Sequence, residues 1–341
     1  MRQSALRMLC AALALFGPPS LAPAQTPPWM TPELLAAAQA EGGVTIYSSV
    51  NETEGLPFWK RFEEATGVKV TFVRGSDVAL NARIAIEHRA QQRAWDLTIT
   101  TSVSQLPPEV LTPYDPLEAM ALDPSARAKD RRWYGSSANY NAPAYNTRLV
   151  AQGDLPKTYA DFATRKEWRG RVGLDATDIQ WLAVMFQHFG EDKARKMLKD
   201  IASALQPVIV DGHLALARAV GAGEYALALN NYTNLTYNVA SNGGPTDIFV
   251  LDPVAVFMVQ VGMNARAPHP NAARLAADYA LSQEAQAFSA KFGRIPVRAD
   301  VQPNPPDAIS RLKAGKIIPV VFGPEDERKW KREFNEIFRP R

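Results

Sequence analysis

The stretch that decides the fold is "GGVTIYSSVNETEGLPFWKRFEEATGVKVTFVRG", residues 42–75. It begins with a run rich in β-branched residues, which predicts a strand, and continues with an amphipathic helix pattern that Gly67 ends. A second β-branched run follows directly. Asn51 and Glu54 have the spacing of a capping box at the start of the helix. The stretch therefore predicts a strand, a helix and a second strand joined by short connections.

The same alternation continues on both sides of this stretch. "TPELLAAAQAEGG", residues 31–43, predicts a helix that Thr31 caps and that two glycines end. Downstream, residues 77–92 predict a second amphipathic helix, and "WDLTITT", residues 95–101, predicts a third strand. A β-α-β-α-β order implies a parallel sheet covered by helices.

A second α/β unit follows later in the chain. "GRVGLD" (170–175), "QPVIVD" (206–211) and "EYALAL" (224–229) predict strands, and helix patterns separate them. Two β segments surround Pro253, a long helical region follows, and "PEDERKWKREFNEIF" predicts a final helix. Two α/β units in one chain predict a ligand cleft between them, since ligands of open parallel sheets bind beyond the carboxyl ends of the strands.

The amino terminus has the pattern of a secretory signal peptide. Arg2 and Arg7 precede a short apolar run, and "APA" supplies small residues before a cleavage point after Ala24. We therefore expect residues 1–24 to be a cleaved signal peptide and the protein to be periplasmic. The single cysteine, Cys10, lies inside this segment, which excludes disulfides and thiolate chemistry from the mature chain.

Charge and composition exclude some partners. The chain has 38 Lys and Arg residues against 35 Asp and Glu residues, for a net charge of +3. The basic residues are scattered, so we expect no nucleic-acid partner. We also expect a monomer and no cofactor, although a solute or a metal ion could be carried as cargo.

Polar side chains stand where four predicted strands end. Such positions offer hydroxyls, carboxylates and free backbone N–H groups, and four of them could line one cleft. Ordinary N-capping explains each one taken singly. The candidate ligand-binding residues are Ser48, Ser49, Asn51, Thr100, Thr101, Ser102, Asp175, Asp178, Asn231, Tyr232 and Thr233.

Motifs for catalysis are weak. HExxH, CxxC and GxSxG are absent from the sequence. His213 lies in a strand-to-helix loop, from which it could approach the cleft. Asp175 with His213 is the best pair for an exported enzyme, which is the less favoured interpretation.

Several segments together resemble bacterial periplasmic solute-binding proteins of ABC importers. They are the opening stretch, "PAYNTRLV", "AGEYALALNNYTN", "PHPNAARLAADYALSQEAQAF" and "GRIPVRADV". The branch most similar contains ferric-ion-binding proteins. The resemblance implies a two-lobed α/β fold (type II periplasmic binding protein), with a cleft between lobes joined by hinge strands. It places lobe one at 25–136 plus 252–298 and lobe two at 137–251 plus 299–341.

The ligand set of the ferric branch is only partly present. That branch uses a histidine, a glutamate and two adjacent tyrosines, and the matching positions here are Asn51, Thr101, Tyr232 and Thr233. Only Tyr232 is kept, and one phenolate is a poor site for Fe(III), which prefers anionic oxygen ligands. Asp175 and Asp178 could restore negative charge or could pair with an amine, so the metal site stays unassigned.

The resemblance implies a function and its partners. We expect the substrate-binding component of an ABC transporter, which captures a small polar solute and delivers it to an inner-membrane permease and its ATPase. Import of ferric iron or another metal is the first alternative. A ligand sensor that signals to a membrane receptor is the second.

Overall fold

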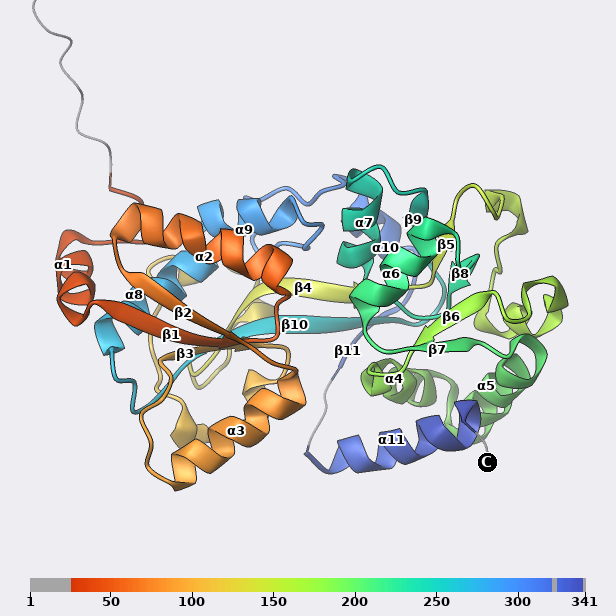
Figure 1. The fold of residues 1–341 in the computed structure, drawn as a ribbon, viewed down its shortest axis with the longest axis horizontal. Coiled ribbons are helices and arrows are strands. Elements are labelled where there is room, and N and C mark those ends of the chain that lie inside the picture. Colours follow the sequence, from red (N-terminus) through yellow and green to blue (C-terminus); the bar gives the residue numbers. More distant parts are fainter. Residues whose placement is uncertain (1–25, 321–323, 340–341) are drawn as a thin grey trace, which may run out of the picture.

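The chain forms two α/β lobes that lie side by side (Figure 1). The computed structural model describes residues 26–320 and 324–339. The predicted signal peptide, residues 1–24, lies outside the described residues. Among the helices that are described, none is long and apolar enough to cross a membrane.

Lobe one is built on a sheet with the strand order β11-β10-β3-β1-β2, in which β4 also pairs with β10. β1 pairs in parallel with β2 and β3, as the β-α-β-α-β pattern predicts. The strands of this sheet are β1 (Gly43–Ser48), β2 (Lys69–Arg74), β3 (Leu97–Thr100), β4 (Tyr134–Asn141), β10 (Val254–Met263) and β11 (Ile317–Pro319). β11 pairs with the end of β10 that lies at lobe two, where Ile318 packs with Val184 of lobe two. The helices are α1 (Pro32–Glu41), α2 (Glu52–Thr66), α3 (Asp77–Arg89), α8 (Pro270–Leu281) and α9 (Gln283–Ala290).

Lobe two is built on a sheet with the strand order β7-β6-β8-β5-β9. β6 pairs in parallel with β7 and β8, so the ends of these three strands meet at one edge. The strands are β5 (Ala144–Asn146), β6 (Val172–Asp175), β7 (Val208–Val210), β8 (Leu227–Ala228) and β9 (Thr246–Ile248). The helices are α4 (Ile179–Phe189), α5 (Glu191–Leu205), α6 (His213–Ala222), α7 (Thr233–Ser241), α10 (Ala308–Leu312) and α11 (Pro324–Phe338).

Two long strands, β4 and β10, run from one lobe to the other (Figure 1). They pair antiparallel from Asn141 with Ala255 to Tyr134 with Val261. The sequence pattern does not predict β4 as a strand. β4 and β10 each contribute residues to both lobes, so no single residue marks the boundary between them. The predicted limits of the lobes therefore stay predictions.

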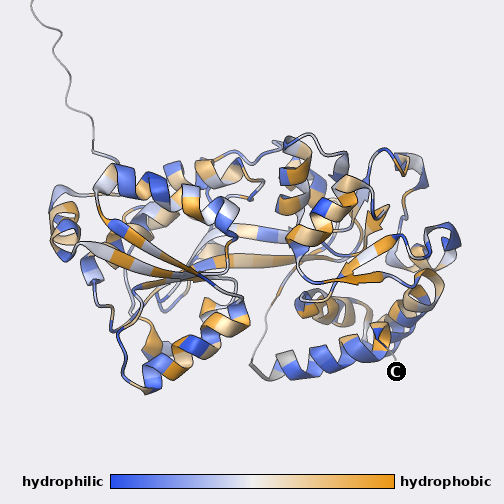
Figure 2. Ribbon diagram, viewed as in Figure 1, coloured by the Kyte–Doolittle hydropathy of each residue, from blue (hydrophilic) through white to orange (hydrophobic). Residues whose placement is uncertain are grey.

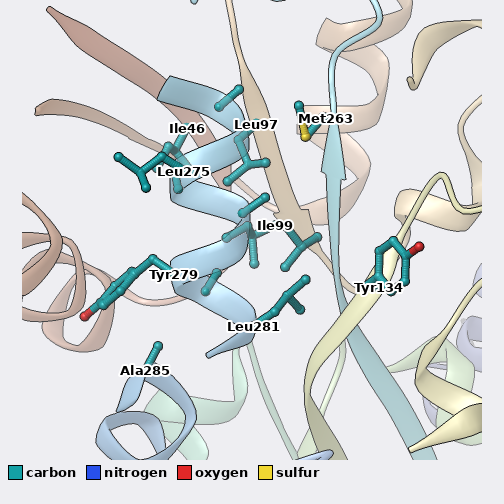
Figure 3. Packing of buried hydrophobic residues seen from close by; sticks show 14 of the residues in the cluster. Ile46, Leu97, Ile99, Tyr134, Met263, Leu275, Tyr279, Leu281 and Ala285 are labelled. Atoms are coloured by element: carbon teal, nitrogen blue, oxygen red, sulfur yellow. The ribbon is translucent and has the colours of Figure 1, made fainter. Parts of the chain in front are cut away.

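Each lobe has its own apolar core. In lobe one, α8 lies against the sheet with Leu275 beside Ile46, whereas Tyr279 points to the other side of α8, where it contacts Phe58 and Phe62 of α2 (Figure 3). The core of lobe two forms where α4, α5 and α11 meet β6, and Leu174, Leu198 and Phe334 belong to it. The ribbon coloured by hydropathy shows apolar strands inside each lobe and a hydrophilic outer side on α11 (Figure 2). Separate cores fit a protein whose lobes are joined by strands.

Local signals set most helix ends as predicted, with one exception. Thr31 Oγ1 accepts a hydrogen bond from Leu34 N–H, and Gly42 ends α1 with a φ of +82°. The prediction of a capping box at the start of α2 was wrong, because the Asn51 side chain makes no capping hydrogen bond. Glu54 is instead buried against Arg294, whose Nε lies 2.8 Å from Oε1.

Candidate functional site

A polar cluster lies at the carboxyl ends of β6 and β8, next to the start of α6. Asp175 ends β6 and Asp178 caps α4, and both side chains are fully buried. His213, the first residue of α6, places Nε2 3.8 Å from Asp175 Oδ1 and 3.6 Å from Asp178 Oδ2. The proximity of Asp175 and His213, which the sequence left open, is therefore established.

Asp175 is held by its own turn and by β8. Thr177 donates to its Oδ1 from both N–H and Oγ1–H, at 2.7 and 2.5 Å. The N–H of Asp175 donates to Asn230 Oδ1 at 2.8 Å. Asp175 Oδ2 is buried and has no hydrogen-bond partner. One oxygen of this carboxylate is thus used twice and the other is unused.

Asp178 has both carboxylate oxygens engaged. Oδ1 accepts the N–H of Trp181 at 3.0 Å, which caps α4. Oδ2 accepts from the side-chain amides of Asn141 and Asn230. Burial raises the pKa of Asp178 to about 6, with Asp175 adding to the rise and His213 opposing it.

Tyr232 and Asn231 close the cluster on the side of β8. The Tyr232 ring stacks on the His213 ring at 3.8 Å between centroids. Asn231 Oδ1 lies 3.1 Å from His213 Nδ1 and positions the imidazole from its other side. Burial, followed by the charges of Asp178, Asp77 and Asp175, raises the pKa of Tyr232 well above its usual value. The phenol is therefore neutral at physiological pH.

The structure brings together the candidates of lobe two. Asp175, Asp178, Asn231 and Tyr232 share contacts with His213, and Thr233 follows at the start of α7, fully buried, with Oγ1 unpaired. Asn230 and Asn141 also belong to the cluster. Asn230 follows β8 in the sequence, a signal that could have found it. Asn141 comes from β4, which the sequence did not predict.

Four candidates of lobe one, Ser48, Thr100, Thr101 and Ser102, are held in hydrogen bonds within that lobe. Ser48 Oγ donates to Ile99 O at 3.0 Å, and Thr100 and Ser102 bond each other. Thr101 Oγ1 donates to Asp77 Oδ2 at 2.5 Å. These hydrogen bonds stay within lobe one, and they are not N-caps, because neither Asn51 nor Ser102 makes a side-chain cap at the helix that it precedes.

The other two lobe-one candidates lie at the start of α2. Ser49 follows β1 and donates its N–H to Ile99 O at 3.1 Å. Asn51 is the N-cap residue of α2, and both side chains are partly exposed. Within the described part of the chain, neither side chain hydrogen-bonds to the lobe-two cluster.

A small cavity in lobe one lies beside Ser48. Its volume is about 40 Å³, and Glu54, Ser137 and Arg294 contribute to its lining. Ser48 is the only predicted site residue that lines it. The space suits one or two water molecules.

The described residues do not form a metal site. In residues 26–320 and 324–339, no group of three or more His, Cys, Asp and Glu side chains is placed to hold a metal ion. Asp178 has no unused carboxylate oxygen, and Tyr232 keeps its proton. The lobe-two cluster thus offers hydrogen-bond acceptors and a ring face more readily than a set of anionic ligands.

Comparison with curated proteins gives relatives that bind iron. The chain is 26% identical over 193 residues to the Fe(3+)-binding periplasmic protein of Serratia marcescens, covering 55% of this chain and 56% of that protein. It is 27% identical over 211 residues to the major ferric iron-binding protein of Neisseria gonorrhoeae, covering 58% and 62%. The match thus spans little more than half the length of these relatives.

Solved structures share the fold over most of the chain. Iron-bound HitA of Pseudomonas aeruginosa matches with a TM-score of 0.70 and 22% identity, covering 87% of this chain and 98% of that one. AfuA of Actinobacillus pleuropneumoniae, with fructose-6-phosphate bound, matches with a TM-score of 0.72 and 19% identity, covering 87% and 99%. The two-lobed periplasmic-binding-protein fold is confirmed. The model of the bacterial extracellular solute-binding protein family matches residues 58–314, so this chain is a member of that family.

Proposed function

We propose that this chain is the periplasmic substrate-binding component of an ABC importer. It captures a small polar solute between its lobes and delivers it to an inner-membrane permease and its ATPase. The observation that carries the proposal is the lobe-two cluster, where Asp175, Asn141 and His213 present unpaired polar atoms beside an aromatic ring. Unpaired buried polar atoms in a native protein call for a partner, and a bound solute supplies one.

The two-lobed architecture supports the same function. β4 and β10 connect the lobes, and a hinge in crossing strands would let the lobes close on a solute. Tyr232 lies close enough to Asp77 of lobe one for the two to interact electrostatically, and Asn141 of β4 donates to Asp178. The nearness of Asp77 of lobe one and of Asn141 of a crossing strand to the lobe-two cluster supports a site between the lobes.

Import of ferric iron is the alternative that the relatives favour, since two of them carry iron-binding names. Tyr232 holds one of the positions that the ferric branch uses. The other positions carry Asn51, Thr101 and Thr233, none of which supplies an anionic oxygen. We therefore place an organic solute ahead of iron.

Thermal shift and titration calorimetry test the proposal. The mature chain would be mixed separately with small primary amines, neutral sugars, sugar phosphates and ferric citrate. A solute at about 100 times its Kd stabilises the folded state by about 2.7 kcal/mol, which raises the melting temperature by several degrees. A melting temperature that none of these classes changes would refute the proposal.

Delivery to a permease needs a separate measurement. The chain would be added to proteoliposomes that contain the permease and the ATPase encoded with it, and uptake of the labelled solute would be followed. ATP-driven uptake that depends on the chain is expected. Solute binding without any uptake would favour the sensor alternative.

A further inference from the structure

The unused atoms of the lobe-two cluster are mainly acceptors. Asp175 Oδ2 and Asn141 Oδ1 are buried without a hydrogen-bond partner, in residues with no solvent exposure. The orientation of the Asn141 amide follows from its Nδ2, which donates to the Asp178 carboxylate, so the remaining atom is an oxygen. A ligand that satisfies both atoms must donate protons to them.

Among the described residues, carboxylates outnumber basic groups around these acceptors, with His213 as the one basic side chain in contact with Asp175 and Asp178. Asp175 and Asp178 are in contact with His213, and Asp77 acts on the same Tyr232 phenol from lobe one. Arg294 is near enough to affect Tyr232, but its guanidinium is already bound to Glu54 by three contacts of 2.8 to 3.1 Å. A cationic donor is therefore favoured over a neutral one.

The start of α4 is closed to anions by the protein itself. A helix N-terminus normally favours a bound anion, because its N–H groups and dipole are positive. Here Asp178 caps that N-terminus through Trp181 N–H. A phosphate or carboxylate of a solute would meet this carboxylate and Asp175, so the end of the solute that enters here is not anionic.

The number of unused carboxylate oxygens in the cluster favours an ammonium group over a metal ion or a guanidinium. A metal ion needs several anionic oxygens, whereas only one carboxylate oxygen of the pair, Asp175 Oδ2, is unused. A guanidinium binds best to both oxygens of one carboxylate, and Asp175 Oδ1 already accepts two hydrogen bonds from Thr177. An ammonium group is compact, carries three donors and needs one acceptor for each.

We propose that the solute carries a primary ammonium group, which donates to Asp175 Oδ2 and Asn141 Oδ1. The carbon chain next to the nitrogen packs against Tyr232, whose ring is fixed by His213 and lies 5.4 Å from the Phe257 ring. This inference rests on the proposed function, because it names the chemistry of the solute for the same site. Aromatic rings and cations attract each other, which adds to the recognition.

The test compares amines with their alcohol isosteres on the unmodified mature chain. Putrescine and ethanolamine would be titrated by calorimetry beside 1,4-butanediol and ethylene glycol, within a wider library of small primary amines. Hydrogen bonds to a charged group are worth about 10- to 150-fold in affinity, so each alcohol should bind at least about tenfold more weakly than its amine. This comparison needs no variant.

Asp175→Asn provides the second arm. Its side-chain oxygen can still accept from Thr177, so the turn is kept while the free carboxylate oxygen is lost. Amine affinity should fall by about 10-fold or more. Asp200→Asn is the matched control, since Asp200 pairs with Lys196 on the exposed side of α5, and it should bind amines like the unmodified chain.

The outcomes separate this inference from the proposed function. Binding of amines that Asp175→Asn weakens supports both. Binding of a neutral sugar, a sugar phosphate or ferric citrate, with no amine bound, overturns the ammonium inference and leaves the binding function standing. Equal affinity for amines and alcohols also overturns the inference, and failure of every class overturns both.

Discussion

The Glu54–Arg294 pair offers a sharp test of how tertiary contacts hold lobe one together. Both side chains are less than a tenth exposed, and Arg294 Nη1 also donates to Asn139 Oδ1 at 2.5 Å. Arg294→Met removes the guanidinium and leaves the Glu54 carboxylate buried without its partner. Removing one member of a buried ion pair costs about 3–5 kcal/mol, because the other charge stays desolvated.

A double-mutant cycle measures the size of the effect. Arg294→Met alone should lower the free energy of unfolding, measured in urea, by about 3–5 kcal/mol. The melting temperature should fall by on the order of 2 °C for each kcal/mol lost. The double variant Glu54→Leu/Arg294→Met removes both charges, so it should recover most of this loss.

An exposed ion pair in the same lobe is the control. Arg61 lies 3.0 Å from Glu284, and both side chains are more than 40% exposed. Arg61→Met should cost less than about 1 kcal/mol, because solvent screens the pair. The reasoning is refuted if Arg294→Met costs no more than Arg61→Met, or if the double variant is no more stable than Arg294→Met.

Further predictions concern pH, packing and capping. Burial raises the pKa of Asp178 from 3.8 to about 6, so the folded state binds this proton more tightly than the unfolded chain does. The free energy of unfolding should therefore fall by up to about 3 kcal/mol as pH rises from 4 to 7. Asp178→Asn should flatten that part of the pH profile measured by urea unfolding, and an unchanged slope would contradict the assignment. Gly173→Ala would place a methyl group against Leu216 and should cost about 1–3 kcal/mol, whereas Gly153→Ala meets open space and should leave the melting temperature within about 1 °C of the original. Ser282→Ala removes the hydroxyl that caps α9 and should cost about 1 kcal/mol, and thermal melts that show no loss would argue against the cap.

Most elements were predictable because their signals are local. Cap residues, terminating glycines and the period of apolar residues lie within a few positions of one another, so α1, β1, β2 and α3 appear close to where the sequence predicts them. These local signals fail where a residue distant in the sequence binds the same side chain. Glu54 has the spacing for a capping box, but Arg294, distant in sequence, binds it instead.

Strand limits show the same dependence on partners. The predicted strand at 224–229 is observed as β8 over two residues only. Ala226 and Leu229 still donate their N–H groups to Arg171 O and Gly173 O, so the run lies along β6 beyond the limits of β8. How far a ladder extends is decided by the neighbouring strand, which the run itself does not encode.

By itself, the sequence determined two α/β units and polar residues at the strand ends, because each of these follows from periodicity and residue type within a short window. The tertiary structure decided which of those residues meet. It brought Asp175, Asp178, His213 and Tyr232 into one cluster and added Asn141 from β4. It also held Ser48, Thr100, Thr101 and Ser102 in hydrogen bonds within lobe one. The physical reason is that unpaired acceptors and net charge depend on contacts between residues far apart in the chain, which only packing creates.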